Sequence, residues 1–233
     1  MPNHTSNVLE VSGNPKIIKA LIKHVSTDEK EPLAISFQKI YPMPASLDIV
    51  AGSQTTCDLN AYKWTIGETE EMEKLYNARK KNGNLDSIDE TLEEFARNEI
   101  KQHDVKMGEQ VYNNIKNYGH PTWYEWRIDN WGTKWDAYDI GEWYEDEEEK
   151  QELSFCTAWG APLNIIRLLS SKFPGLTLKL KYADEGQQFL GYVVYKNGQE
   201  IDSKEFDDDW ESPEAKKCLE GTLYYEFEDE VED

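Results

Sequence analysis

Cysteine is scarce in this sequence, which holds only Cys57, Cys156 and Cys218 among its 233 residues. Their number is odd and no two of them form a C-x-x-C pair, so neither a disulfide framework nor a zinc ribbon is expected. We therefore predict three free thiols.

Long apolar runs are missing as well. No stretch approaches the roughly 20 apolar residues of a membrane-spanning helix, and residues 1–7 are polar, unlike the apolar core of a signal peptide. The expected location is a reducing cytoplasm, without attachment to a membrane.

Positive charge is in short supply. Lys and Arg total 25 against 46 Asp and Glu, which gives a formal net charge of −21. Nucleic acids and anionic membranes attract positively charged surfaces, so direct binding to either is not expected. The acidity is compatible with a basic protein partner, and equally with solubility alone.

The common motifs of catalysis are absent too. The histidines, His4, His24, His103 and His120, form no H-x-x-x-H or H-E-x-x-H pattern, and the glycines form neither a P-loop nor a G-x-G-x-x-G motif. Carboxylates are so frequent that their pairs say nothing about acid–base catalysis. No catalytic residue, metal or cofactor is therefore predicted.

Aromatic residues, in contrast, are concentrated at 122–144, which holds five of the eight tryptophans. Such a stretch predicts a packing centre with hydrogen-bonded polar groups. The alternative is a pocket for a flat anionic ligand such as a nucleotide, with Arg127 and Lys134 supplying charge. For His4 the two interpretations are a member of this polar site and a hydrogen-bonded residue that ties the N-terminus to the sheet. The candidate cluster comprises His4, Trp126, Arg127, Asn130, Trp131, Lys134, Trp135, Asp136 and Trp159.

Hydrophobic periodicity predicts the secondary structure. Helices are expected at 15–25 and 162–173, with a helical insertion at about 68–118 in which 87–90 form a capping box, and a short helix at 212–219. Residues 145–152 are expected to form an acidic connector. Strands are expected at 7–12, 33–40, 153–159, 176–182, 190–196, 199–206 and 222–227.

This order predicts an α+β fold in a single elaborated domain spanning 1–233. Its centre is a ferredoxin-like antiparallel sheet with two helices on one face, extended by the insertion and by a C-terminal hairpin and strand. The opposite face is left for the aromatic stretch. An acidic tail occupies 226–233.

Five segments carry a family resemblance. They are Met1–His4 with Asn7 and Leu9-x-Val-x-Gly13; Lys39–Pro44; Trp126-Arg127-x-x-Asn130–Ala137; Phe155-x-Thr157–Trp159-x-x-Pro162 with Phe173-Pro174; and Tyr182–Glu185 with Gly191-Tyr192. Together they resemble the YubB-like ferredoxin-like domain family of phages, prophages and conjugative plasmids. The match leaves out 68–118 and the region after about 205, and it departs at Cys156 and at Gly160-Ala161.

The resemblance implies the fold and an origin in a mobile element, and it transfers no catalytic residue. Our leading hypothesis is a non-enzymatic accessory protein that binds and inhibits a host protein in the host cytoplasm, in counter-defence. An acidic surface that imitates DNA would suit a partner with a basic nucleic-acid-binding site. The alternatives are a protein that sequesters a nucleotide signal and an enzyme of unrecognised type, and the oligomeric state is left open. The acidic surface comprises Glu145, Asp146, Glu147, Asp207, Asp208, Asp209 and Glu211.

Overall fold

The computed structural model describes residues 3–27, 33–85, 89–147, 150–206 and 210–219. The chain divides into two compact units. Met1–Pro42 and Arg127–Asp233 form the first, which contains the sheet, and Met43–Trp126 form the second, whose described elements are all helical. The helices predicted at 68–118 are thus part of a longer helical unit.

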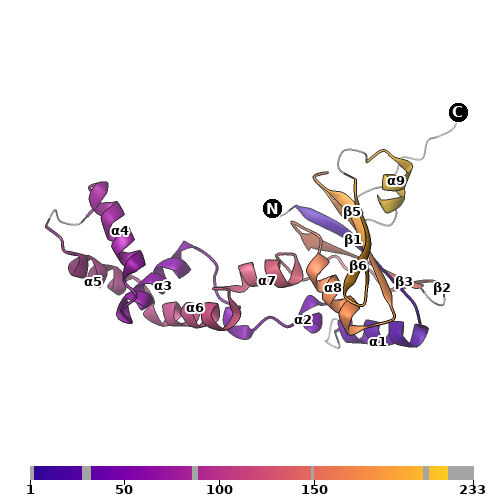
Figure 1. Ribbon diagram of the computed structural model, residues 1–233, viewed down its shortest axis with the longest axis horizontal. Helices are drawn as coiled ribbons and strands as arrows, with labels where there is room; N and C mark the ends of the chain where they lie inside the picture. Colours follow the sequence, from indigo (N-terminus) through magenta and orange to yellow (C-terminus); the bar gives the residue numbers. More distant parts are fainter. Residues whose placement is uncertain (1–2, 28–32, 86–88, 148–149, 207–209, 220–233) are drawn as a thin grey trace. The chain divides into compact units, whose positions relative to one another are not determined.

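The sheet of the first unit has six strands in the order β2-β3-β1-β4-β5-β6, and every neighbouring pair is antiparallel (Figure 1). This confirms the predicted α+β, ferredoxin-like class. The strands are β1 (His4–Ser12), β2 (Tyr144–Glu147), β3 (Lys150–Ala158), β4 (Thr177–Asp184), β5 (Leu190–Lys196) and β6 (Gln199–Glu205).

The register explains why one face of the sheet forms the core. Leu9 lies opposite Leu153 on one side and Leu180 on the other, and Leu180 lies opposite Val193. Residues directly opposite in an antiparallel sheet point to the same face. All four side chains are buried, so this apolar row is the centre of the core.

Two helices cover that face, as predicted. They are α1 (Pro15–Val25) and α8 (Leu163–Lys172). The Asn14 side chain accepts a hydrogen bond from the Lys16 N–H at the start of α1, and Pro15 occupies the first helical position. A short third helix, α9 (Pro213–Leu219), lies against β4 and β5. Its buried residues pack with Ala183 and Leu190, which alternate with the core row and therefore belong to the opposite face.

The strand predicted at 33–40 is wrong, because this segment forms the short helix α2 (Phe37–Ile40). Ile35 and Phe37 are buried as a strand pattern would require. A carboxylate from a distant part of the chain, Asp136, accepts hydrogen bonds at the start of the helix, from the Phe37 and Gln38 N–H groups. A helix cap supplied by a residue so distant in sequence cannot be predicted from local periodicity.

The helical unit begins with a 3-10 turn, Ala45–Leu47. Thr91 and Glu94 form a capping box at the start of α5, whereas Ser87 of the capping box expected at 87–90 lies outside the described residues. The glycine of α6, Gly108, meets α3 closely: a Cβ added there would lie 2.0 Å from the Asp58 carbonyl oxygen. Among its described residues the unit contains α3 (Ser53–Thr65), α4 (Glu70–Lys81), α5 (Leu92–Gln102) and α6 (Val105–Tyr118).

Two further expectations need correction. The acidic segment 145–152 is no simple connector, since it contributes to β2 and to the start of β3. The aromatic stretch does not lie on the face opposite the helices, because Trp131 packs on Phe37, whose ring contacts the core residue Phe155. The strand expected at 222–227 and the tail 226–233 lie outside the described residues.

Candidate functional site

The aromatic stretch begins with helix α7 (Trp123–Trp131). Trp131, at its end, is 1% exposed. Its indole N–H donates to the Tyr41 carbonyl oxygen at 3.0 Å, and its ring centroid lies 5.9 Å from that of Phe37. A buried indole with a satisfied N–H is a packing element.

The charged residues of the stretch have separate partners. The guanidinium carbon of Arg127 lies 5.0 Å from the centroid of the Trp131 ring, a cation–π geometry. Asp136 accepts hydrogen bonds from the Phe37 N–H at 2.6 Å and the Ser36 hydroxyl at 2.9 Å. The Lys134 ammonium lies 5.5 Å from the centroid of the Trp135 ring.

His4 lies at the start of β1 and links three segments. Its Nδ1 is 2.7 Å from the Tyr138 hydroxyl, its backbone N–H donates to Glu185 Oε1, and its carbonyl accepts from the Glu185 N–H. Burial raises the pKa of Tyr138 to about 12, with Cys156 and Asp139 adding to the shift. The phenol therefore remains protonated near neutral pH, and these bonds tie the N-terminus to the sheet.

Two of the remaining predicted residues lie close to His4. Trp135 packs edge-on against Tyr138, the partner of His4, with 6.2 Å between the ring centroids, and the Trp159 N–H donates to the Asn3 carbonyl oxygen at 3.0 Å. Trp126 is buried in α7, where Asn130 is half-buried. Trp135 is 36% exposed and Trp159 is 53% exposed, the latter with a φ of 72°. The structure thus brings His4, Trp135 and Trp159 together at the start of β1, whereas Arg127 packs on Trp131 and Asp136 binds the start of α2.

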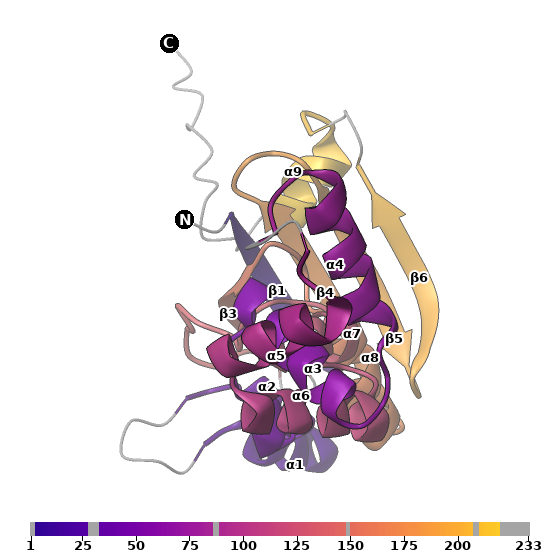
Figure 2. The same cartoon turned by 90° about the vertical axis from the view of Figure 1, so that its left-hand side faces the viewer.

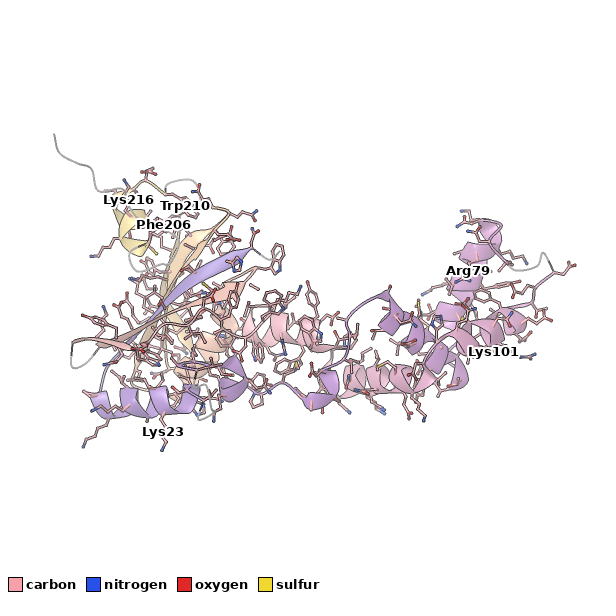
Figure 3. The ribbon with its side chains drawn as sticks, turned by 180° about the vertical axis from the view of Figure 1, so that it is seen from behind. Lys23, Arg79, Lys101, Phe206, Trp210 and Lys216 are labelled. Atoms are coloured by element: carbon pink, nitrogen blue, oxygen red, sulfur yellow. The ribbon has the colours of Figure 1, made fainter. Side chains whose placement is uncertain are left out.

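The predicted acidic surface is only partly described. Asp207, Asp208 and Asp209 lie outside the described residues, and Glu145, Asp146 and Glu147 are placed only as backbone of β2. Glu211 is exposed and its carboxylate lies 3.1 Å from the Lys216 ammonium. Figure 3 shows Trp210 and Lys216 at the end of the sheet that α9 covers.

Strand β6 extends this surface in a way that sequence reasoning largely missed. It is the last strand of the sheet (Figure 2), and all seven of its residues are exposed. We define the acidic edge as Glu200, Asp202 and Glu205. The first and last lie opposite Tyr195 and Gly191, and Asp202 lies opposite Val194. The carboxylates therefore occupy both faces of one sheet edge. The only sequence feature that could have indicated this arrangement is the alternating pattern of residues 199–206.

Two tyrosines hold part of this edge. The Tyr192 hydroxyl donates to Asp202 Oδ2 at 3.3 Å, and the Tyr182 hydroxyl donates to Glu205 Oε1 at 3.4 Å. Burial, together with these carboxylates, raises the pKa of both tyrosines. Both phenols therefore stay protonated and act as donors.

No group of three or more His, Cys, Asp or Glu side chains is arranged to hold a metal ion within the described ranges. The thiols of Cys57, Cys156 and Cys218 are free, the last two of them buried. None of the described helices combines the length and the apolar character that a membrane span requires.

The sheet order and its helices define an α+β, ferredoxin-like domain. Residues 133–232 match the sequence profile of a family described as the ferredoxin-like domain in Api92-like protein. A crystal structure of protein api92 from Yersinia pseudotuberculosis is similar, with 15% sequence identity and a TM-score of 0.47; the match covers 88% of this chain and 98% of that chain. No curated protein matches the sequence.

Proposed function

We propose that this chain is a non-enzymatic accessory protein of a phage or related mobile element, and that it binds a basic surface of a host protein through the acidic edge. The observation that carries the proposal is that β6 is exposed along its whole length and bears three carboxylates with a single lysine. The lysine, Lys204, is itself paired with Glu214 of α9.

Position on an edge strand favours recognition of a partner. An edge presents backbone groups that another chain can approach, and charged side chains on it select the approaching sequence. Carboxylates on both faces would select lysine or arginine at successive positions of the partner. A net charge of −21 adds long-range attraction for a basic surface. Inhibition of a host defence protein that binds DNA is the role that fits the resemblance described above.

The experiment that tests the proposal compares two charge-reversed proteins. The partner is first captured with tagged parent protein from host lysate and identified by mass spectrometry. Its affinity is then measured for a variant with Glu200→Lys and Asp202→Lys, and for a control with the same reversal at the exposed Glu142 and at Glu93 of the helical unit. We expect the first variant to lose binding and the control to retain it. Equal affinities for the two proteins would refute the acidic edge as the binding surface.

A further inference from the structure

A hollow of about 570 Å³ lies on the face of the sheet that α9 partly covers. Its floor is built by register. Glu10 of β1 lies opposite Glu152 of β3 and Lys179 of β4, and Tyr192 of β5 lies opposite Lys181. All of these side chains point away from the core row and toward the hollow.

Four lysines line this hollow, which is unusual in a chain where acidic residues outnumber basic ones by 21. Against them stand three glutamates, so the lining has a net charge of +1. Lys181 is only 8% exposed, a degree of burial that lysine reaches when its charge is paired. The lysines are Lys150, Lys179, Lys181 and Lys217.

The lysines fall into two pairs. Lys181 is bonded to Glu10 at 3.0 Å and Lys150 to Glu152 at 2.6 Å. The other two, Lys179 and Lys217, have no carboxylate within ion-pair distance among the residues that the structure describes. The ammonium group of Lys179 instead lies 4.5 Å from the centroid of the Tyr192 ring.

We infer that the hollow binds a small phosphorylated molecule, with the ammonium groups of Lys179 and Lys217 contacting its phosphate. The volume is in the range of small-molecule sites, roughly 300–1,000 Å³. Two cations without carboxylate partners match a dianion, and the ion pairs of Glu10 and Glu152 hold the floor rigid around it. A long polyanion is excluded, because the acidic surroundings would repel every phosphate outside the hollow. This inference does not rest on the host partner, and the hollow adjoins the acidic edge through the hydrogen bond from the Tyr192 hydroxyl to Asp202.

Calorimetric titration of the full chain tests the inference with ADP, inorganic phosphate and adenosine as probes. We expect ADP to bind best, inorganic phosphate to bind more weakly, and adenosine not to bind. The double variant Lys179→Gln with Lys217→Gln should weaken ADP binding about a hundredfold, since each charge-assisted contact is worth about a factor of ten.

The control carries the same charge change elsewhere, at the exposed Lys23 of α1 (Figure 3) and Lys196 of β5. Its affinity for ADP should stay within about twofold of the parent, because distant exposed charges are screened. A second variant, Lys179→Arg with Lys217→Arg, keeps both charges and should keep binding. Thermal melting of each protein reports whether it is folded.

Three results would overturn the inference. The parent protein could bind neither ADP nor phosphate. Adenosine could bind as tightly as ADP, which would show that charge is not recognised. The glutamine double variant could bind ADP as tightly as the control, which would place the ligand outside this hollow.

Discussion

Asp136 caps a helix that begins 99 residues earlier in the chain: its Oδ1 accepts a hydrogen bond from the Phe37 N–H at 2.6 Å. The same carboxylate accepts from the Ser36 hydroxyl and the Gln38 N–H. One side chain therefore fixes the loop after α7 to the start of α2. This relationship gives Asp136 a structural role, which is one of the two interpretations that the sequence left open for the aromatic stretch.

The variant Asp136→Ala should destabilise the sheet unit by about 2 kcal/mol, because it leaves a helix start without its acceptor. Urea unfolding followed by tryptophan fluorescence measures this. The control is Asp139→Asn, an exposed carboxylate whose φ of 47° asparagine tolerates. It should change the free energy of unfolding by less than about 0.5 kcal/mol. Equal stabilities of the two variants would contradict the capping role.

The aromatic stretch should respond unequally to truncation. Trp131→Ala removes a buried ring and its hydrogen bond to Tyr41, and we expect it to destabilise the protein by about 3–5 kcal/mol. Trp135 is 36% exposed, so Trp135→Ala should lower the free energy of unfolding by less than about half as much as Trp131→Ala does. Thermal unfolding of both variants checks the order, which the reverse result would disprove.

Several secondary-structure elements could be predicted correctly because the interactions that determine them are local in sequence. Buried and partly exposed residues alternate along the first half of strand β4 and along most of β5. The tight turn between β5 and β6 requires positive φ values, and Asn197 and Gly198 adopt them, at 53° and 75°. Helix α1 has its cap and its apolar stripe within a few residues. Long-range causes were missed: the strand expected at 33–40 becomes a helix under the influence of Asp136.

The same distinction holds for the sites. The hollow gathers Glu10, Lys150, Lys179 and Lys217 from three strands and a helix, and only the register brings them together. Nothing in the local sequence marks Lys179 apart from its place in the alternating strand. In the predicted aromatic cluster, residues close in sequence, such as Arg127 and Asp136, contact different partners, and only the folded chain shows which partner each one has.

Gly108 should tolerate no larger residue. An added Cβ would lie 2.0 Å from the Asp58 carbonyl oxygen and 2.8 Å from the Tyr62 Cβ, so α6 would have to move away from α3. We expect Gly108→Ala to destabilise the helical unit by at least about 3 kcal/mol, seen as a lower melting temperature by circular dichroism at 222 nm. Asn113→Ala, on an exposed position of the same helix, should be neutral or stabilising. An unchanged melt for Gly108→Ala would mean that the two helices are farther apart.

His24 should give the stability a pH dependence. Burial, with smaller contributions from Lys172 and Lys39, lowers its pKa below 6.5. Between the two pKa values the unfolded chain binds a proton that the folded chain does not, so stability is fully present above about pH 6.5 and falls as the pH drops toward the folded pKa. Urea unfolding at several pH values should show this slope in the parent and a smaller slope in His24→Gln. Identical slopes would exclude His24 as its source.

The last prediction separates imitation of DNA from ordinary charge attraction at the acidic edge. If Glu200, Asp202 and Glu205 occupy a nucleic-acid site of the partner, binding should weaken as salt rises, since exposed charges are screened over about 8 Å at physiological ionic strength. Duplex DNA should then compete with the protein for the partner. Reversal of Glu200 and Asp202 should lower the association rate more than it raises the dissociation rate, as electrostatic steering requires. Surface plasmon resonance over a range of salt concentrations, with and without DNA, measures all three effects.

The possible results separate the two explanations. Salt-sensitive binding without competition by DNA would support a basic partner but contradict the imitation of DNA. Binding that is unchanged by salt would exclude the acidic edge as the binding surface, and the acidity would then serve solubility alone.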